Sequence, residues 1–298
     1  MAISWRRIGD AAAGEDYRRA AALMIAGMLA FAALDGLRKA MAADVPLTVI
    51  VATRYAVFTV VVAAWLPGEG RALLRTSHLW LQLARSLVMV AEASVFVLAL
   101  RHASLANASA AFAAAPVAGV VLAIVLLREH ARPATWAALA VSLAGIVIML
   151  HPAGGTGGQR LGLALALASA LLYGLYGVLT RKVHEDGART SFAYMTLGGL
   201  GACLVALAVT RISWHPDGRN GLLLAGAAVA AAIGQYLLIR AYGKAPAVTL
   251  QPFNYFLFAW SVPISVIFFG SPPSLTALVG AVLVVGAGAY LFGLAGAE

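Results

Sequence analysis

Charged side chains are scarce in this chain of 298 residues. They make up 11% of it, whereas hydrophobic residues make up 62%. Soluble domains average about 25% charged residues. A water-soluble fold of this length has no means of burying so much apolar side chain. The composition therefore excludes a soluble enzyme or binding module and predicts an integral membrane protein.

Acidic residues are scarcer than basic ones, with 12 Asp and Glu against 21 Lys and Arg, which gives a net charge of +9. In a soluble protein this balance would suggest a nucleic-acid partner. Here the basic residues stand singly at the ends of apolar runs, where membrane proteins place them. We therefore expect a lipid bilayer as the partner of this chain and no nucleic acid.

Several chemistries lack the residues that they need. The single cysteine, Cys203, excludes an internal disulfide, and the 6 histidines are scattered without metal-ligand spacing. The sequence holds no G-x-x-x-x-G-K-[ST], H-E-x-x-H or G-x-S-x-G motif. We therefore expect no cofactor, no metal, no catalytic residues and no enzyme activity. An intramembrane enzyme that uses Asp35 and Glu92 as an acid pair is the alternative from another class.

Long apolar runs are abundant, and each can form a membrane-crossing helix of about 20 residues. Short connectors with Gly, Pro and Asp separate them, none long enough for a soluble domain. The predicted fold is an all-α integral membrane protein with ten spans, at 20–41, 46–66, 79–101, 104–127, 134–150, 161–182, 191–209, 221–242, 247–269 and 274–294.

The basic residues also predict the orientation. With residues 1–19 as a cytoplasmic segment, most Lys and Arg side chains fall in the inner connectors, as the positive-inside rule requires. Arg38 is assigned to an outer connector in this topology. Both termini are then cytoplasmic. The first span resembles a signal peptide, with Ala30-Phe31-Ala32 as a cleavage site, but we expect it to be retained.

An internal repeat divides the chain near residue 151. The stretch ALRHASLANASAAF from Ala99 resembles AYGKAPAVTLQPFN from Ala241, and Leu34-Asp35-Gly36-Leu37 resembles Leu175-Tyr176-Gly177-Val178. The halves, 20–150 and 151–298, then hold five spans each. Because five is odd, the second half enters the membrane from the opposite side. Such inverted repeats are the common plan of secondary transporters, with a site near the midplane.

The segment ALRHASLANASAAFAAAPVAGVVLAIVLLREHARPATW at 99–136 resembles the repeat of the drug/metabolite transporter superfamily, EamA type. The resemblance rests on Pro116, Leu127-Arg128-Glu129, Trp136 and Gly145, with a weaker copy at 241–292 in which Ser271 replaces the acidic residue. It implies two five-helix repeats around a central cavity. Within the superfamily the chain looks most like amino-acid and metabolite exporters, including the YddG-type aromatic amino-acid exporters.

Four ionisable residues lie inside predicted spans, where each costs at least about 2.5–3.5 kcal/mol at the centre. They are Asp35, Arg54, Arg85 and Glu92. Arg85 and Glu92 are seven residues apart, so they share a helix face and can both point into one cavity. Alternatively, Arg85 snorkels to the interface. Asp35 and Arg54 lie in adjacent antiparallel spans, where a salt bridge between them is expected.

Aromatic and amide residues form the second candidate group for solute binding, namely Tyr173, Tyr176, Gln235, Tyr236, Asn254 and Tyr255. The resemblance places the helix with Tyr173 and Tyr176 around the central cavity. Packing or an interfacial aromatic belt is the alternative role for each aromatic residue.

These observations predict a secondary transporter of the bacterial cytoplasmic membrane, acting as a monomer by alternating access. The expected substrate is a small exported metabolite, with an amino acid, aromatic or otherwise, as the first expectation. A vitamin or a nucleotide-like solute is the alternative. A proton gradient is the expected energy source, since no nucleotide-binding motif is present.

Overall fold

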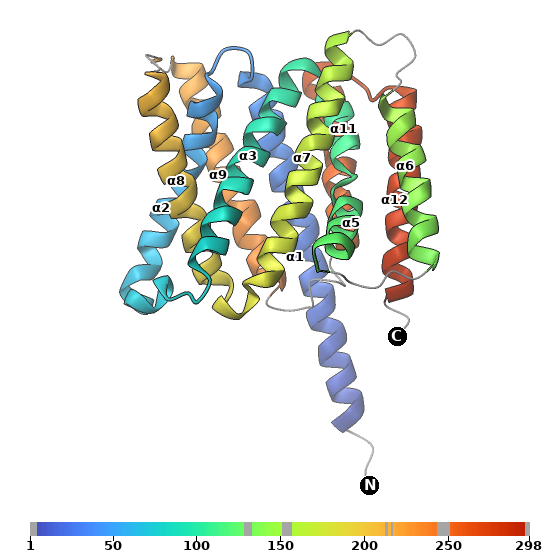
Figure 1. The fold of residues 1–298 in the computed structure, drawn as a ribbon, viewed down its shortest axis with the longest axis horizontal. Helices are drawn as coiled ribbons and strands as arrows, with labels where there is room; N and C mark the ends of the chain where they lie inside the picture. The colour runs from blue at the N-terminus through green and yellow to red at the C-terminus, as the bar shows by residue number, and fades with distance from the viewer. Residues whose placement is uncertain are drawn as a thin grey trace.

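The structure, a computed structural model, describes residues 5–127, 133–150, 157–211, 214–215, 217–242 and 251–295. All regular elements in these ranges are helices, and they stand side by side as one bundle (Figure 1). The helices are α1 (Trp5–Met41), α2 (Leu47–Glu69), α3 (Leu79–His102), α4 (Leu105–Phe112), α5 (Ala115–Leu127), α6 (Pro133–Leu150), α7 (Gly157–Lys182), α8 (Ala188–Thr210), α9 (Gly218–Tyr242), α11 (Phe256–Phe269) and α12 (Leu275–Ala295), with short 3₁₀ turns η1 (Gly70–Leu74), η2 (His184–Asp186) and η3 (Gln251–Tyr255).

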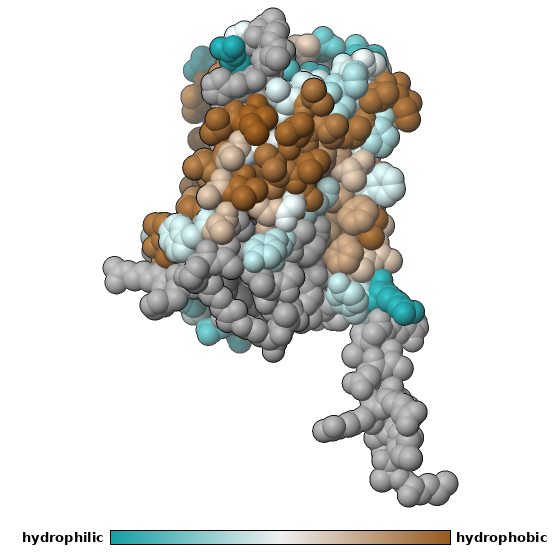
Figure 2. Space-filling model, turned by 90° about the vertical axis from the view of Figure 1, so that its right-hand side faces the viewer, coloured by the Kyte–Doolittle hydropathy of each residue, from teal (hydrophilic) through white to brown (hydrophobic). Residues whose placement is uncertain are grey.

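Seven of these helical segments are long and apolar enough to cross a membrane: Tyr17–Met41, Leu47–Ala64, Leu79–His102, Leu105–Leu126, Gly157–Thr180, Arg189–Thr210 and Gly218–Leu238. Phe253–Phe269 and Leu275–Ala287 are shorter apolar helices. Figure 2 shows hydrophobic side chains gathered across the middle of one face, with hydrophilic ones above them. The predicted all-helical membrane protein is confirmed, whereas the number of ten spans stays a prediction.

The first helix is longer than predicted. Residues 5–19, expected as a segment outside the fold, continue into the first span as part of α1, which projects beyond the bundle (Figure 1). The end of α12 lies toward the same side of the bundle as the start of α1. That this side is cytoplasmic remains the prediction made from the basic residues.

The predicted span at 104–127 is broken into α4 and α5. Pro116 has no backbone N–H, and its ring would clash with the carbonyl four residues earlier, at Phe112. The chain accordingly leaves the regular α-helical pattern at Ala113 and Ala114, where Ala114 N bonds to Ala111 O at 3.1 Å. The break sets α4 apart as a short helix at one end of the bundle.

The helices pack in pairs that link the two halves of the chain. The most extensive contacts join α1 to α9, α3 to α7 and α6 to α12, and smaller ones join α5 to α7 and α2 to α8. In the order of the two repeats, α1 corresponds to α7, α2 to α8, α3 to α9 and α6 to α12. The α1–α9 and α3–α7 pairs are then equivalent, whereas the α2–α8 and α6–α12 pairs each join a helix to its own counterpart. In Figure 1, α1 begins at the lower end of the bundle and α7 at the upper end.

Two basic side chains tie the ends of α1 and α3 together. Lys39, in the last turn of α1, donates to the carbonyls of Leu100 and Ala103 at the end of α3. Arg101, in the last turn of α3, donates to Ala42 O at 2.6 Å and to Val45 O at 3.1 Å, just beyond α1. Each cation satisfies carbonyls that have no partner at a helix C-terminus and complements the negative end of the helix dipole.

Glycine allows α8 to lie directly against α2 and α3. A Cβ at Gly199 would enter the ring of Tyr55, and one at Gly198 would lie 2.7 Å from Ser86 Cβ. Tyr55 is fully buried, so its ring has no free space into which it can move. Small residues at helix interfaces let backbones approach closely in membrane proteins.

Replacing Gly199 with Ala should therefore lower the free energy of unfolding by about 1–3 kcal/mol, the usual cost of overpacking. Gly201→Ala is the matched control on the same helix, because a Cβ there meets nothing within 4 Å. Thermal unfolding of the purified protein in detergent gives both midpoints. Equal midpoints for the two variants would contradict the packing of α8 on Tyr55.

Candidate functional site

Helices α1, α2 and α3 bring four charged side chains together in the interior of the bundle. Asp35, Arg38, Arg54 and Glu92, called the charge cluster below, are each at most 6% exposed. Three of them are predicted site residues. The fourth, Arg38, was assigned to an outer connector because it lies close to the end of the span. Its position one turn after Asp35 was the available signal.

The expected salt bridge between Asp35 and Arg54 is replaced by a pair within α1. Arg38 Nη1 donates to Asp35 Oδ1 at 3.1 Å, and both side chains are buried. Residues three apart on a helix are neighbours, so this pair forms without any constraint on how α1 and α2 pack. Arg54 is left to act on Asp35 at longer range.

Arg54 is held by aromatic rings. Its Cζ lies 5.2 Å from the ring centroid of Phe58 and 5.9 Å from that of Tyr55. Arg54 Nε and Arg38 Nη2 are both buried and have no hydrogen-bond partner in the described part of the chain. Buried donors without partners are rare in native structures and call for a ligand or an ordered water. The two guanidinium groups can therefore accept a solute that carries hydrogen-bond acceptors.

Glu92 links the cluster to the second half of the chain. Its Oε1 accepts a hydrogen bond from Ser169 Oγ of α7 at 3.0 Å. The positive charges of Arg54 and Arg38 both act on this carboxylate. Its neighbours on the same helix face, Met89 and Phe96, are also buried, as their spacing predicts. Glu92 thus faces the interior of the bundle.

Arg85 belongs to a separate network and neither snorkels nor meets Glu92. It is 1% exposed. Its Nη2 donates to Gln82 Oε1 at 2.8 Å and to the carbonyl of Ser191, and its Nη1 donates to Thr180 Oγ1 at 3.2 Å and to Tyr176 OH at 3.4 Å. These partners lie on α3, α7 and α8, so Arg85 joins the two halves near the end of the bundle where α3 begins.

The network continues to Asp186 in η2. Its carboxylate accepts from Gln82 Nε2 at 2.8 Å and from Thr76 Oγ1, and the Ser77 amide is 3.4 Å away. We call Thr76, Gln82, Arg85, Asp186 and Ser191 the end network. Sequence reasoning missed Gln82 and Asp186, although Gln82 lies one turn before Arg85 in an apolar run.

Aromatic rings form a row that runs from Phe96 on α3 to Tyr176 on α7. Ring centroids are 5.2 Å apart for Phe96 and Phe112, 5.5 Å for Phe112 and Tyr173, and 6.2 Å for Tyr173 and Tyr176. Arg85 Cζ lies 5.3 Å from the Tyr176 ring. Such edge-on and tilted arrangements suit aromatic pairs. This aromatic row offers ring faces and edges to a flat solute.

The remaining predicted site residues lie outside these clusters. Tyr236 is 53% exposed, and its hydroxyl accepts from Arg240 Nη1 at 3.2 Å. Helix α9 meets α1 through Gly234 and Leu238, which turns Tyr236 away from the bundle interior. Gln235 and Asn254 are half-buried, whereas Tyr255 is buried with its hydroxyl unpaired in the described structure.

Metal binding finds no support among the described residues, where no group of three or more His, Cys, Asp or Glu side chains lies close enough to hold an ion. Cys203 is buried and free.

The end network predicts how stability depends on pH. Burial raises the pKa of Asp186, but the hydrogen bonds from Thr76, Gln82 and the Ser77 amide, together with His78, lower the pKa below its ordinary value. The ionised carboxylate therefore stabilises the fold at pH above its unfolded pKa of about 4, and this contribution is lost as the pH falls through the folded value.

Asp186→Asn should accordingly lower the unfolding midpoint at pH 7, and the difference from the parent protein should shrink below about pH 4. Unfolding in detergent over that pH range measures it. Asp44→Asn is the control, because the partner of Asp44 among the described residues is exposed Arg219, at 3.5 Å. A difference that is the same at every pH would show that the Asp186 charge does not matter.

The chain matches known proteins over most of its length. The EamA-like transporter family matches residues 18–151 and again residues 160–293. A riboflavin transporter of Brucella anthropi is 27% identical over 83% of this chain and 88% of its own length. Riboflavin transporters of Rhizobium johnstonii, at 28% over 74% and 73%, and of Vibrio cholerae, at 26% over 88% and 89%, are also similar.

A solved crystal structure shares the fold, with a TM-score of 0.65 and 21% identity, over 93% of this chain and 97% of that one. The two family matches divide the chain at the connector where the sequence repeat divides it. They cover almost all of its described helices. The chain is therefore a membrane transporter that belongs to the EamA-like family of the drug/metabolite transporter superfamily.

Proposed function

We propose that this protein carries a small, flat, vitamin-like solute across the bacterial cytoplasmic membrane by alternating access, with riboflavin as the first candidate. The observation that carries the proposal is the aromatic row beside buried guanidinium groups with unused donors. A solute moves across unchanged, since the family transports and does not catalyse.

The chemistry of a flavin suits this arrangement. Its fused rings are flat and apolar on both faces, and they can pack against Phe112 and Tyr173. The ring carbonyls are hydrogen-bond acceptors, which Arg54 and Arg38 can reach without a new charge entering the interior. Guanidinium groups are weakly hydrated and suited to such buried contacts. Phe96, one turn after Glu92, joins the two parts of the site.

The relatives support the vitamin alternative over the first expectation. Three of the similar proteins bear the name riboflavin transporter. An amino acid, for which Asp35 or Glu92 would bind the ammonium group and Arg54 the carboxylate, gains nothing from these comparisons. The direction of transport is part of the proposal, and uptake and export remain separate outcomes of the assay.

The proposed mechanism uses the two halves as inverted five-helix repeats, 20–150 and 151–298, with the site at their interface. Contacts that link the halves are the elements that have to change during the cycle: Glu92 to Ser169 at the site, and Arg85 to Thr180 and Ser191 at one end. A proton gradient is the proposed energy source, with Glu92 as the candidate proton carrier.

Counterflow in liposomes tests the function. Vesicles loaded with unlabelled riboflavin, tryptophan or another metabolite are placed in the same compound carrying a label. We expect labelled riboflavin to accumulate transiently, and an imposed pH gradient to change the net flux. Exchange of tryptophan but not of riboflavin would show that the substrate is an amino acid and not the vitamin. Exchange of neither compound would contradict both proposed substrates.

Glu92→Gln is the variant for this assay, because it keeps the shape and the hydrogen bond from Ser169 but removes the charge. If the carboxylate carries a proton, net flux driven by the pH gradient should fall at least tenfold while counterflow persists. Ser142→Ala, at a buried hydroxyl on α6 outside the site, is the control. Equal responses of Glu92→Gln and the parent to the pH gradient would reduce Glu92 to a structural role.

A further inference from the structure

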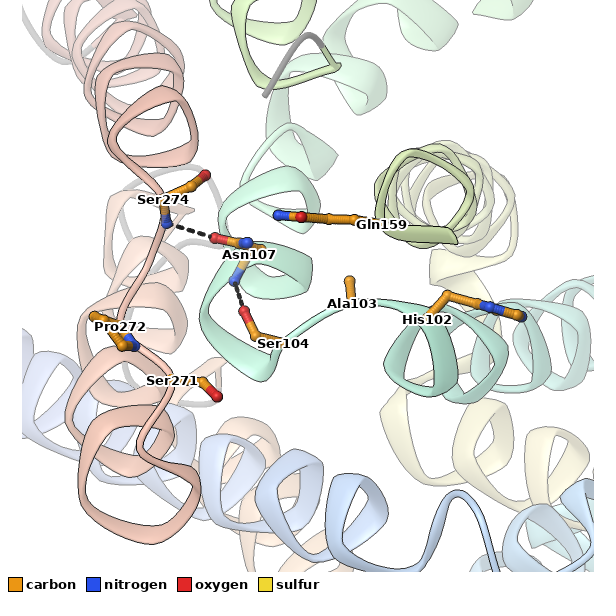
Figure 3. A pocket seen from close by; sticks show the side chains of 8 residues that line it. All are labelled: His102, Ala103, Ser104, Asn107, Gln159, Ser271, Pro272 and Ser274. Atoms are coloured by element: carbon orange, nitrogen blue, oxygen red, sulfur yellow. Dashed lines mark hydrogen bonds between the residues drawn. The ribbon is translucent and has the colours of Figure 1, made fainter. Parts of the chain in front are cut away.

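A hollow of about 400 Å³ opens where α3 ends and α7 begins, and Figure 3 shows the side chains that line it. Figure 1 shows these helix ends at the end of the bundle opposite to the start of α1. It lies on the seam between the two halves of the chain. The first half contributes His102, Ala103, Ser104 and Asn107, and the second contributes Gln159, Ser271, Pro272 and Ser274. Its volume falls in the range of pockets that hold small organic ligands.

The polar groups of the hollow are suited to neutral hydrogen bonding. Amide, hydroxyl and imidazole groups are the polar side chains that line it, and the described lining contains no Asp, Glu, Lys or Arg. Ser104 Oγ accepts a hydrogen bond from the backbone N–H of Asn107 at 3.3 Å, so the Ser104 hydroxyl hydrogen is left to donate. Ser271 Oγ donates to Phe269 O at 3.0 Å and keeps its lone pairs. Paired donors and acceptors of this kind match hydroxyl groups.

Asn107 is the central residue of the hollow. It is only 4% exposed. Figure 3 shows it between Ser104 and Ser274, with Gln159 pointing toward it from α7. Its Oδ1 accepts from the Ser274 amide at 2.9 Å, which holds the start of α12 against α4. Its Nδ2 makes no hydrogen bond to the described residues, so a donor remains for a ligand in the hollow.

The hollow lies on the same helices as the aromatic row. Asn107 precedes Phe112 by five residues on α4, which is about 7.5 Å along the axis. Helices α3 and α7, whose ends line the hollow at His102 and Gln159, carry Phe96 and Tyr173 further along. A solute bound in the hollow is therefore one or two helical turns from the first ring of the row.

We propose that the hollow is a second solute subsite, which binds the hydroxyl-bearing part of a neutral solute at this face of the membrane through Asn107 Nδ2. The inference rests on the proposed function, since it takes the same solute that the central site carries. In a solute with a polyhydroxylated chain on a flat ring, the hydroxyl groups would bind in the hollow. The ring would then pack against the aromatic row.

Asn107→Asp tests the subsite without removing the contact between the halves, because the carboxylate keeps the acceptor for the Ser274 amide. Only the donor to the hollow is lost, and a charge is gained. Ser109→Ala is the matched control on α4, since its buried hydroxyl has no described partner. The readout is the riboflavin concentration that gives half-maximal flux, measured from each face in vesicles of known orientation.

For Asn107→Asp we expect this concentration to rise about tenfold from the face that bears the hollow and to stay within twofold from the other face. Ser109→Ala should match the parent on both. An unchanged concentration for Asn107→Asp on the hollow face, or an equal rise on both faces, would overturn the subsite. The unfolding midpoint of each variant, measured in parallel, detects any loss of folding.

A binding measurement separates failure of the subsite from failure of the proposed function. Ser271→Cys places a thiol in the hollow, and a membrane-impermeant maleimide labels it from that face. Riboflavin should slow the labelling at least threefold, and Asn107→Asp should abolish the protection. Protection without counterflow would contradict the proposal of riboflavin transport and support the proposed subsite. Counterflow without protection would support riboflavin transport and contradict the proposed subsite.

Discussion

The cost of placing a charge in hydrocarbon is the constraint on which the rest of the structure depends. Each charge near the centre of a span costs at least about 2.5–3.5 kcal/mol, so charged side chains turn inward and the helices have to pack around them. Arg85 meets most of this demand, because its two terminal nitrogens have partners on three helices and only its Nε is buried without one. Arg54 does not, because aromatic rings lie beside its guanidinium and its buried Nε, like the rest of that group, makes no hydrogen bond to the described residues.

That contrast separates the two roles of buried charge in this protein. A guanidinium surrounded by acceptors fixes the position of α3 against α7 and α8, and a bound solute would have to displace those contacts. A guanidinium without any hydrogen-bonded acceptor is incomplete until one arrives. We therefore propose the charge cluster as the place where a solute gains binding energy, whereas the end network holds one end of the bundle together.

Composition predicted the helical membrane fold, and the segment at 99–136 predicted the family. The same reasoning found Asp35, Arg54, Arg85 and Glu92, since isolated charges stand out in apolar runs. It did not identify the residues that form hydrogen bonds and ion pairs with these side chains. Lipid is as apolar as the packed interior, so these helices carry no clear polar stripe to show which face is inside. The cost of a charge in lipid predicted that Glu92 points inward, but nothing in the sequence showed that Tyr236 points outward.

Two other differences have local causes. Arg38 lies near the end of its span, and such residues usually reach the interface, yet here Asp35 one turn earlier holds it in the interior. Pro116 divides a run of apolar residues that hydropathy treats as continuous, because hydropathy does not register a missing N–H. The first feature places Arg38 in the charge cluster, and the second leaves the short helix α4 beside the hollow.

Binding of the transported solute at the charge cluster is the central claim, and a ligand-dependent shift in unfolding tests it most directly. A solute that binds only the folded protein raises its stability as RT ln(1 + [L]/Kd), so about 100 times Kd adds about 2.7 kcal/mol. Riboflavin should raise the unfolding midpoint of the parent protein and of Asp186→Asn, and the rise should be lost in Arg54→Gln. A rise of the same size in Arg54→Gln would contradict the account.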